Sequence, residues 1–373
     1  MGSSPSAPES RRGRRDWASL DAGPAGLIAE RVLSNDVVDL VRFRAVCRPW
    51  RACSAHLRAR GVLDRRFHPR RWIMLPDTFN DVHHRRCFIN VFTGERIYPS
   101  APPKPDSCHL LGNTSEGLVL LSRKDADLIQ LLNPMTGQVT DLPPASKLLE
   151  DPYERPEHLT LRGAGLADDS TIAIHLKCFS LAVAKPGDKR WTYLRSRHRI
   201  TSVLPLAGRI YCATKKNISV VQTMENQRPQ LVEAADHNLD MSTAGAYFGG
   251  EPYIGRNKIF LVDNDGELIL CHRRCWEPGS THGSCCLYRV NFDTRNIQPL
   301  ARLNERALFI SRRRSLLVAS MVSPSISADT VYVCWPKVAA IDLSGGCAKP
   351  KFKKGDDAAY YLSCYVNKKV KLG

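Results

Sequence analysis

Short stretches rich in apolar and β-branched residues dominate the chain from residue 72 onward, and turn-forming residues separate them. Two such stretches around a tight turn predict a β-hairpin, as at 87–92 and 95–98 around Thr93-Gly94. Helical periodicity is almost absent here, so the pattern indicates an all-β domain. Further hairpins are predicted around 133–137, 186–188, 264–266 and 293–295, with a last strand pair at 331–335 and 338–343.

The predicted hairpins recur at intervals of roughly 40–50 residues, the repeat length of a four-stranded propeller blade. Gly94, Gly137 and Gly187 mark successive turns at this spacing. The repeat favours a β-propeller of about six or seven blades, because each sheet then packs on the next and few strand edges stay exposed. A large sandwich or barrel is the alternative, since its strands are also short and evenly spaced.

Residues 16–57 show a different pattern, in which apolar residues recur at helical spacing. Leu27, Ile28 and Val32 give a first helix an apolar side, and Asn35 or Asp36 can cap a second helix. Pro49 fits the first turn of a third short helix, with Trp50 close to the turn before it. The sequence therefore predicts a small all-α unit of three helices ahead of the all-β domain.

Two features modify this helical unit. Gly23, Pro24 and Gly26 are expected to delay the start of the first helix. The long side chains of Arg42, Arg44 and Arg48 interrupt the apolar side of the second helix and are expected to stay solvated.

The helical unit is too short to bury all of its apolar residues, because three helices in about forty residues enclose little core. The surplus predicts a docking face. An ordinary helical lobe that packs on the rest of the chain is the alternative. The apolar residues in question are Leu20, Leu27, Ile28, Val38, Val46 and Trp50.

The segment from Trp17 to Trp50, with Phe43–Arg51 and the pair Leu27-Ile28, resembles the F-box of plant F-box proteins. Asp21 stands where that family usually has proline. The resemblance implies docking on a Skp1-like adaptor and, through it, on the cullin and RING protein of an SCF (Skp1-cullin-F-box) E3 ubiquitin ligase. The contacts that it implies are Leu20, Leu27, Ile28, Leu33, Val38, Val46, Cys47 and Trp50.

Residues 72–346 are similar to the propeller domain that follows the F-box in KIB-type F-box proteins of plants. Leu131–Gly137, Trp191–Leu194 and Val331–Leu343 carry this resemblance. These segments are structural motifs, so they imply the propeller fold and no particular ligand.

The predicted organisation is a disordered basic tail at 1–15, an F-box at 16–57, a connector at 58–71 and a KIB-type β-propeller at 72–373. The run Arg11–Arg15 is either a nuclear import signal or simply a basic tail. Near the C-terminus, Ala358–Val366 is apolar and aromatic, and it is predicted to be the last strand, which closes the ring against the first blade.

Charge and cysteine content limit the partners and the cell compartment that can be expected. The net charge is +17, from 54 basic and 37 acidic residues, which permits attraction to acidic partners without choosing among them. The 13 cysteines form an odd count, and no apolar signal sequence opens the chain, so free thiols in the cytoplasm or nucleus are expected. No run approaches the ~18 apolar residues that a membrane span needs, so no membrane partner is expected.

The sequence contains only weak signals for a metal site. Cys271, Cys275, Cys285 and Cys286 with His272 and His282 have poor spacing for zinc, since adjacent cysteines on a strand point to opposite faces. Asp81, His83 and His84 lie in a polar loop, and Asp263–Glu267 is explained by a hairpin turn better than by a calcium loop.

Catalytic signatures are missing from the sequence. There is no nucleophile elbow, phosphate-binding loop or dinucleotide fingerprint. Scattered Ser, His and Asp residues can still converge in space. The sequence favours a non-catalytic protein without a cofactor.

Two functions remain open at this stage. In the first, the chain is a substrate receptor, with the F-box on the adaptor and the propeller on an unidentified protein target. In the second, the F-box is degenerate and the basic propeller is a scaffold for an acidic protein or nucleic acid. Nucleic acid would require a clustered basic face with interleaved aromatic residues, whereas the basic residues are dispersed. The sequence therefore favours the first.

Overall fold

The computed structural model divides the chain into two compact units, residues 1–59 and residues 60–373. The expected tail at 1–15, with Arg11–Arg15, lies outside the residues that the structure describes. None of the described helices has the length and apolar content that crossing a membrane requires. The described residues are 17–58, 61–75, 86–99, 108–123, 126–148, 161–177, 179–224, 227–239, 247–248, 251–252, 257–275, 283–311, 314–334, 338–345, 347–348, 350, 352 and 357–367.

The first unit, called the helical unit from here on, contains the three predicted helices. A 3-10 helix, η1 (Trp17–Ser19), precedes α1 (Ala22–Asn35), α2 (Val37–Val46) and α3 (Arg48–Ala52). Asp36 caps α2, because its Oδ1 accepts the Val38 backbone N–H at 2.7 Å. Pro49 lies in the first turn of α3, where a missing N–H costs nothing. The prediction of three helices is confirmed.

The expected delay at the start of α1 is wrong. The helix begins at Ala22, so Gly23, Pro24 and Gly26 all lie in its first turns. The first four N–H groups of any helix lack intrahelical partners, so Pro24 loses no hydrogen bond there. The Ala25 N–H then starts the regular pattern by donating to the Asp21 carbonyl at 3.0 Å.

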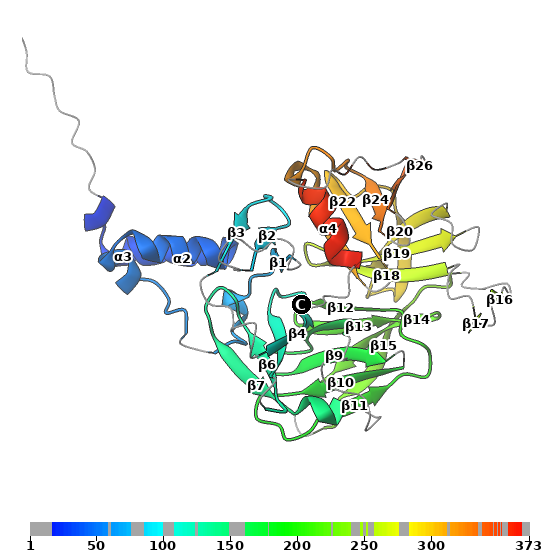
Figure 1. Ribbon diagram of the computed structural model, residues 1–373, viewed down its shortest axis with the longest axis horizontal. Helices are drawn as coiled ribbons and strands as arrows, with labels where there is room; N and C mark the ends of the chain where they lie inside the picture. Colours follow the sequence, from blue (N-terminus) through cyan, green and yellow to red (C-terminus); the bar gives the residue numbers. More distant parts are fainter. Residues whose placement is uncertain are drawn as a thin grey trace, which may run out of the picture. The chain divides into compact units, whose positions relative to one another are not determined.

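The second unit is an all-β propeller of six blades, each a sheet of three to five strands (Figure 1). Strands that are neighbours in a sheet are antiparallel, except for the parallel pair β22 and β24 of the sixth sheet. The first sheet holds β1 (Trp72–Met74), β2 (Phe88–Asn90) and β3 (Arg96–Ile97). The second holds β4 (Cys108–Asn113), β5 (Val119–Arg123), β6 (Ile129–Leu132) and β7 (Val139–Leu142).

The third sheet holds β8 (Gly163–Leu166), β9 (Ile172–Lys177), β10 (Ser180–Ala184) and β11 (Thr192–Arg195). The fourth holds β12 (Ser202–Leu206), β13 (Arg209–Ala213), β14 (Asn217–Gln222) and β15 (Gln230–Asp236). The fifth holds β18 (Asn257–Asn264), β19 (Glu267–Cys275), β20 (Gly283–Asn291) and β21 (Asn296–Leu300). The sixth holds β22 (Arg306–Ile310), β23 (Ser315–Ala319), β24 (Thr330–Val333), β25 (Ala339–Asp342) and β26 (Cys347–Ala348).

Smaller elements complete the second unit. The strands β16 (Tyr247–Phe248) and β17 (Glu251–Pro252) pair between the fourth and fifth sheets in sequence. The 3-10 helices are η2 (Arg65–Phe67), η4 (Ala145–Leu148) and η6 (Ser320–Val322), and one α-helix, α4 (Ala358–Asn367), follows the sixth sheet.

The predicted hairpins are present in the sheets. The turn at Asn133–Gly137 joins β6 to β7, and the turns at 186–188, 264–266 and 293–295 join β10 to β11, β18 to β19 and β20 to β21. Asn133 shapes the first of these turns, because its Oδ1 accepts the N–H groups of Met135 and Thr136. Local turn chemistry was therefore a sound guide to strand pairing.

Buried apolar clusters join successive sheets from the second to the sixth. Ile172 and Ile174 of the third sheet pack with Leu120 and Leu131 of the second. Equivalent clusters join the third sheet to the fourth, the fourth to the fifth and the fifth to the sixth. The approach is close at Gly165 in β8, where a Cβ atom would lie 1.9 Å from Pro205 Cγ in β12.

The C-terminal segment closes the ring as a helix, so the prediction of a last strand at Ala358–Val366 is wrong. Ala359, Leu362 and Val366 lie on one side of α4 and join a cluster that contains residues of both the first and the sixth sheets. Asp357 caps the helix, since its Oδ1 accepts the Ala359 N–H at 2.8 Å. The helical spacing of these apolar residues overrides the strand preference of the tyrosines between them.

Replacing the buried Leu362 of α4 tests this closure. Leu362 is fully buried, so Leu362→Ala should lower the free energy of unfolding by about 2–5 kcal/mol. Leu27→Ala is the matched control, because Leu27 is 74% exposed and its loss should cost less than about 0.5 kcal/mol. Urea unfolding followed by tryptophan fluorescence measures both. Equal midpoints for Leu362→Ala and wild type would contradict a closing role for α4.

His68 is a buried titratable group at the start of the propeller. Its Nε2 lies 3.2 Å from the Val62 carbonyl oxygen, and its Nδ1 has no hydrogen-bond partner among the described residues. Burial, helped by the positive charge of Arg70, lowers the pKa of His68 to about 4. The ring is therefore neutral in the folded protein at pH 7.

This histidine should make the propeller acid-sensitive. The unfolded chain takes up the proton near pH 6.5 and the folded chain only near pH 4, so stability is fully present above about pH 6.5 and falls as the pH drops between these values. Between pH 7 and pH 5 we expect wild type to lose about 2 kcal/mol more than His68→Gln. Urea unfolding at both pH values gives this difference, and identical losses in the two proteins would refute it.

Candidate functional site

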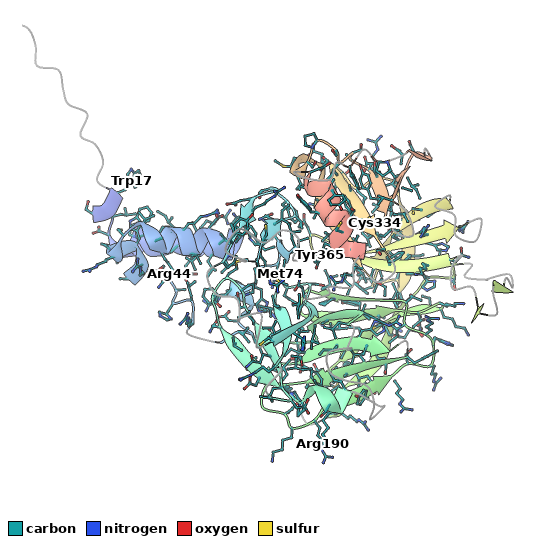
Figure 2. The ribbon with its side chains drawn as sticks, viewed as in Figure 1. Trp17, Arg44, Met74, Arg190, Cys334 and Tyr365 are labelled. Carbon is teal, nitrogen blue, oxygen red and sulfur yellow. The ribbon has the colours of Figure 1, made fainter. Side chains whose placement is uncertain are left out.

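The helical unit exposes several large apolar side chains. Leu27 and Ile28 on α1 are 74% and 41% exposed, and Val46 at the end of α2 is 62% exposed. Trp17 in η1 is also exposed (Figure 2). Exposed apolar residues gathered on so small a unit are typical of a surface that a partner covers.

The structure separates the residues predicted to contact an adaptor into three groups. Leu27, Ile28 and Val46 are exposed, whereas Leu20, Cys47 and Trp50 are half-buried. Leu33 and Val38 are buried. Leu33 is buried because it continues the inward stripe of Ala25 and Ala29 at four-residue steps.

Trp50 has a role inside the helical unit. Its ring stacks on Phe43 of α2, with centroids 4.6 Å apart and an angle of 18° between the planes. Its Nε1–H donates to the Trp17 carbonyl at 3.0 Å. Trp50 therefore fixes η1 against α3 while part of its surface stays open.

Arg44 is the residue that sequence reasoning misjudged. It was expected to stay solvated, yet its Nη1 lies 2.7–3.2 Å from Ser54 Oγ and from the carbonyl oxygens of Arg51, Ser54 and Ala55. In return, Arg51 Nε donates to the Arg44 carbonyl at 3.0 Å. A guanidinium surrounded by carbonyl oxygens holds the chain that leaves α3 and so supports the orientation of the helices.

Substitution of Arg44 should loosen this end of the helical unit. Arg44→Met removes the donor, so we expect at least about tenfold faster amide exchange at Arg51 and Cys53, whose N–H groups donate to the carbonyls of Cys47 and Pro49. The control is Arg42→Met, which removes an exposed arginine that pairs with Asp39. Hydrogen exchange with mass spectrometry measures both variants, and equal exchange would contradict the role of Arg44.

The described residues that the sequence offered as metal ligands belong to regular strands and turns of the sheets. Asp263–Glu267 forms the turn from β18 to β19, and Asp263 Oδ1 accepts the Gly266 N–H at 2.8 Å. Cys271 and Cys285 lie in adjacent strands, where a hydrogen bond with the Cys285 thiol, together with burial, raises the pKa of Cys271, so that thiol is protonated. Within the described ranges no three His, Cys, Asp or Glu residues gather to hold a metal ion. The residues Asp81, His83, His84 and His282 and the Cys275 side chain lie outside those described.

Comparison with known families identifies the propeller. The family model described as the KIB1-4 beta-propeller covers residues 88–361, which span parts of all six sheets. No curated protein matches the chain.

Solved structures resemble the propeller only distantly. A catalytically inactive virginiamycin B lyase from Staphylococcus aureus, solved with quinupristin, is 9% identical, covers 67% of this chain and 72% of its own, and has a TM-score of 0.31. PorZ of Porphyromonas gingivalis is 13% identical, covers 77% and 40%, and has a TM-score of 0.33. The N-terminal domain of Nup159 is 9% identical, covers 75% and 76%, and also scores 0.33. Because these identities and TM-scores are low, no functional argument rests on the three structures.

Proposed function

The chain belongs to the KIB1-4 beta-propeller family, and on this premise we propose that it is the substrate-receptor subunit of an SCF E3 ubiquitin ligase. In this proposal the helical unit is an F-box that docks on a Skp1-like adaptor, and the propeller binds a protein target. The adaptor links the chain to the cullin and the RING protein. Such a receptor works in the cytoplasm or the nucleus.

The observation that carries the proposal is the exposed pair Leu27-Ile28 on a helical unit that is compact by itself. Burial of a leucine or isoleucine side chain supplies about 1.5–3 kcal/mol, so the pair and Val46 can provide much of the affinity for an adaptor. The core of the unit, with Leu33 and the stack of Trp50 on Phe43, holds these side chains in place.

The propeller supplies the second half of the function. Propellers are protein-interaction folds, and their loops carry the contacts to partners on a rigid ring. A receptor of this kind performs no chemistry, because it acts by raising the effective concentration of a target lysine near the charged ubiquitin-conjugating enzyme. Two compact units in one chain suit this division of tasks.

Introduction of two negative charges at the exposed pair tests the docking. Full-length chain co-expressed with a plant Skp1-type adaptor should co-elute with it in size-exclusion chromatography. The double variant Leu27→Asp, Ile28→Asp should bind at least about 100-fold more weakly, because each substitution buries a carboxylate in place of an apolar side chain. Binding is quantified by calorimetry with purified proteins.

The matched control is the double variant Val139→Asp, Phe179→Asp, which adds the same two charges at residues of the propeller that are 49% and 53% exposed. It should co-elute like wild type. A well-folded wild type that elutes without the adaptor would overturn the proposal and favour a scaffold whose net charge of +17 attracts an acidic protein or nucleic acid.

A further inference from the structure

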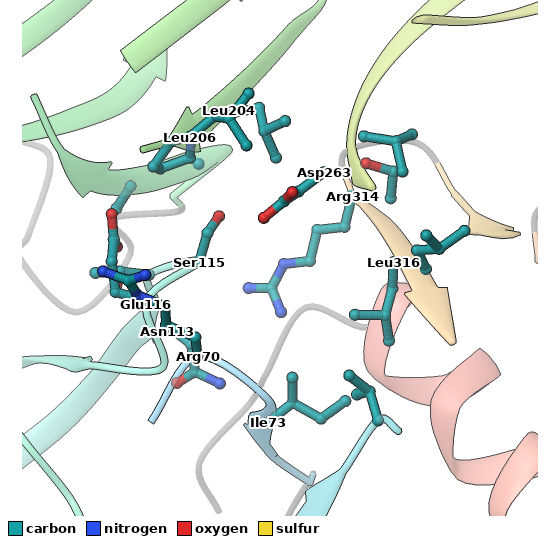
Figure 3. A pocket seen from close by; sticks show the side chains of 18 of the residues that line it. Arg70, Ile73, Asn113, Ser115, Glu116, Leu204, Leu206, Asp263, Arg314 and Leu316 are labelled. Atoms are coloured by element: carbon teal, nitrogen blue, oxygen red, sulfur yellow. The ribbon is translucent and has the colours of Figure 1, made fainter. Parts of the chain in front are cut away.

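The propeller encloses a central cavity of about 550 Å³, lined by one strand from each of its six sheets. These strands are β1, β4, β8, β12, β18 and β23, and Figure 3 shows the side chains that point into the space between them. This volume falls within the range of small-molecule sites, which is roughly 300–1,000 Å³. The cavity is therefore large enough for an organic ligand of moderate size.

The guanidinium of Arg314 lies in the middle of this cavity (Figure 3). Its carbon atom Cζ is 5.1 Å from the centroid of the Tyr365 ring on α4. Its Nη1 is buried and has no hydrogen-bond partner in the described part of the chain. Burial of a charged donor without an acceptor is costly, so its presence points to an acceptor that the described residues do not supply.

The other arginines of the cavity wall either have a charged, polar or aromatic contact or are exposed; Arg71 is exposed, and its Cζ lies 4.9 Å from the centroid of the Phe92 ring. Arg65 pairs with Asp169 at 2.5 Å, and Arg162 Nε donates to the Leu176 carbonyl at 3.1 Å. Arg70 is exposed at the edge of the cavity, where it adds a second positive charge (Figure 3). Arg314 is thus a half-buried cation of the wall, and its buried Nη1 has no hydrogen-bond partner among the described residues.

The acidic residues of the wall do not neutralise Arg314. Glu116 is buried, its Oε1 accepts the Leu166 N–H at 3.0 Å, and burial raises the pKa of its carboxyl group. Asp263 faces the same space, but its Oδ1 accepts the Gly266 N–H and no ion pair joins it to Arg314 in the described part of the chain. Asp265 pairs with Arg306.

Apolar side chains complete the wall beside Arg314. Ile73 of β1, Leu204 of β12 and Leu316 of β23 line the cavity on different sides (Figure 3). Polar groups that fix orientation within a mostly apolar wall are typical of sites for small organic molecules.

We propose that the central cavity binds a small organic anion, whose carboxylate or phosphate accepts hydrogen bonds from Arg314 while its apolar part lies against Ile73, Leu204 and Leu316. A planar guanidinium suits either group, since both accept two parallel hydrogen bonds. The inference does not depend on docking to an adaptor, because all of these residues belong to the propeller.

Three probes of equal chain length test the inference on the full-length protein. Hexanoate and hexyl phosphate carry the two candidate anionic groups, and hexanamide is the neutral analogue. Saturation-transfer NMR at constant ionic strength gives the dissociation constants. We expect at least one anion to bind tenfold more tightly than hexanamide, and the tighter anion identifies the preferred group. Equal affinity of all three probes, or no binding, would overturn the proposal.

The variant Arg314→Met removes the guanidinium and retains an apolar side chain beside Tyr365. It should reduce anion affinity to within threefold of that for hexanamide while leaving hexanamide binding unchanged, which also shows that the cavity is intact. The matched control is Arg190→Met, since Arg190 is exposed in the turn between β10 and β11 (Figure 2). A loss in Arg190→Met equal to that in Arg314→Met would attribute binding to net charge and refute a specific site.

Discussion

The architecture of this protein depends on the closure of the ring between its first and last sheets. The first sheet has three strands where the second to fifth have four, and the C-terminal segment does not add the fourth strand that the sequence had suggested, because it is a helix. Instead α4 packs with residues of the first and sixth sheets in one apolar cluster. Arg96 of β3 lies 5.3 Å from the Tyr361 ring centroid, and the Ala319 N–H of β23 donates to the Val91 carbonyl, so both sheets contact this seam directly. These contacts therefore join opposite ends of the propeller sequence.

The central cavity is a consequence of the same geometry. Six sheets arranged around an axis bring their inner strands together. Gly165 allows β8 to approach Pro205 of β12, which narrows the ring there. On the opposite side, Arg314 precedes β23 and contacts Tyr365 of the closing helix. The helix that closes the ring therefore also positions the cationic group of the cavity.

Much of the fold was predictable because its information is local. Turns such as Asn133–Gly137 depend on side chains that bond to the adjacent backbone, and the cap of α2 by Asp36 is of the same kind. The helix α4 was missed although Ala359, Leu362 and Val366 follow helical spacing, because the aromatic residues among them favour strands. The environments of Arg44 and Arg314 had no local signal in the sequence. The oxygen atoms around Arg44 come from residues seven to eleven positions away, and the cavity around Arg314 is assembled from six sheets, so their environments exist only after folding.

The helical unit and the propeller use apolar residues in opposite ways. In the propeller, leucine and isoleucine side chains such as Leu120 and Ile172 are fully buried between sheets, and their burial stabilises the ring. In the helical unit, α1 contributes only Ala25, Ala29 and Leu33 to the core, which α2 completes with Val37, Val38, Leu40 and Phe43, while Leu27 and Ile28 on α1 remain exposed. Small residues toward the core let the helices approach closely, but they contribute little apolar area. The larger side chains are thus available to a partner, and a unit with so small a core gains additional stability when one binds.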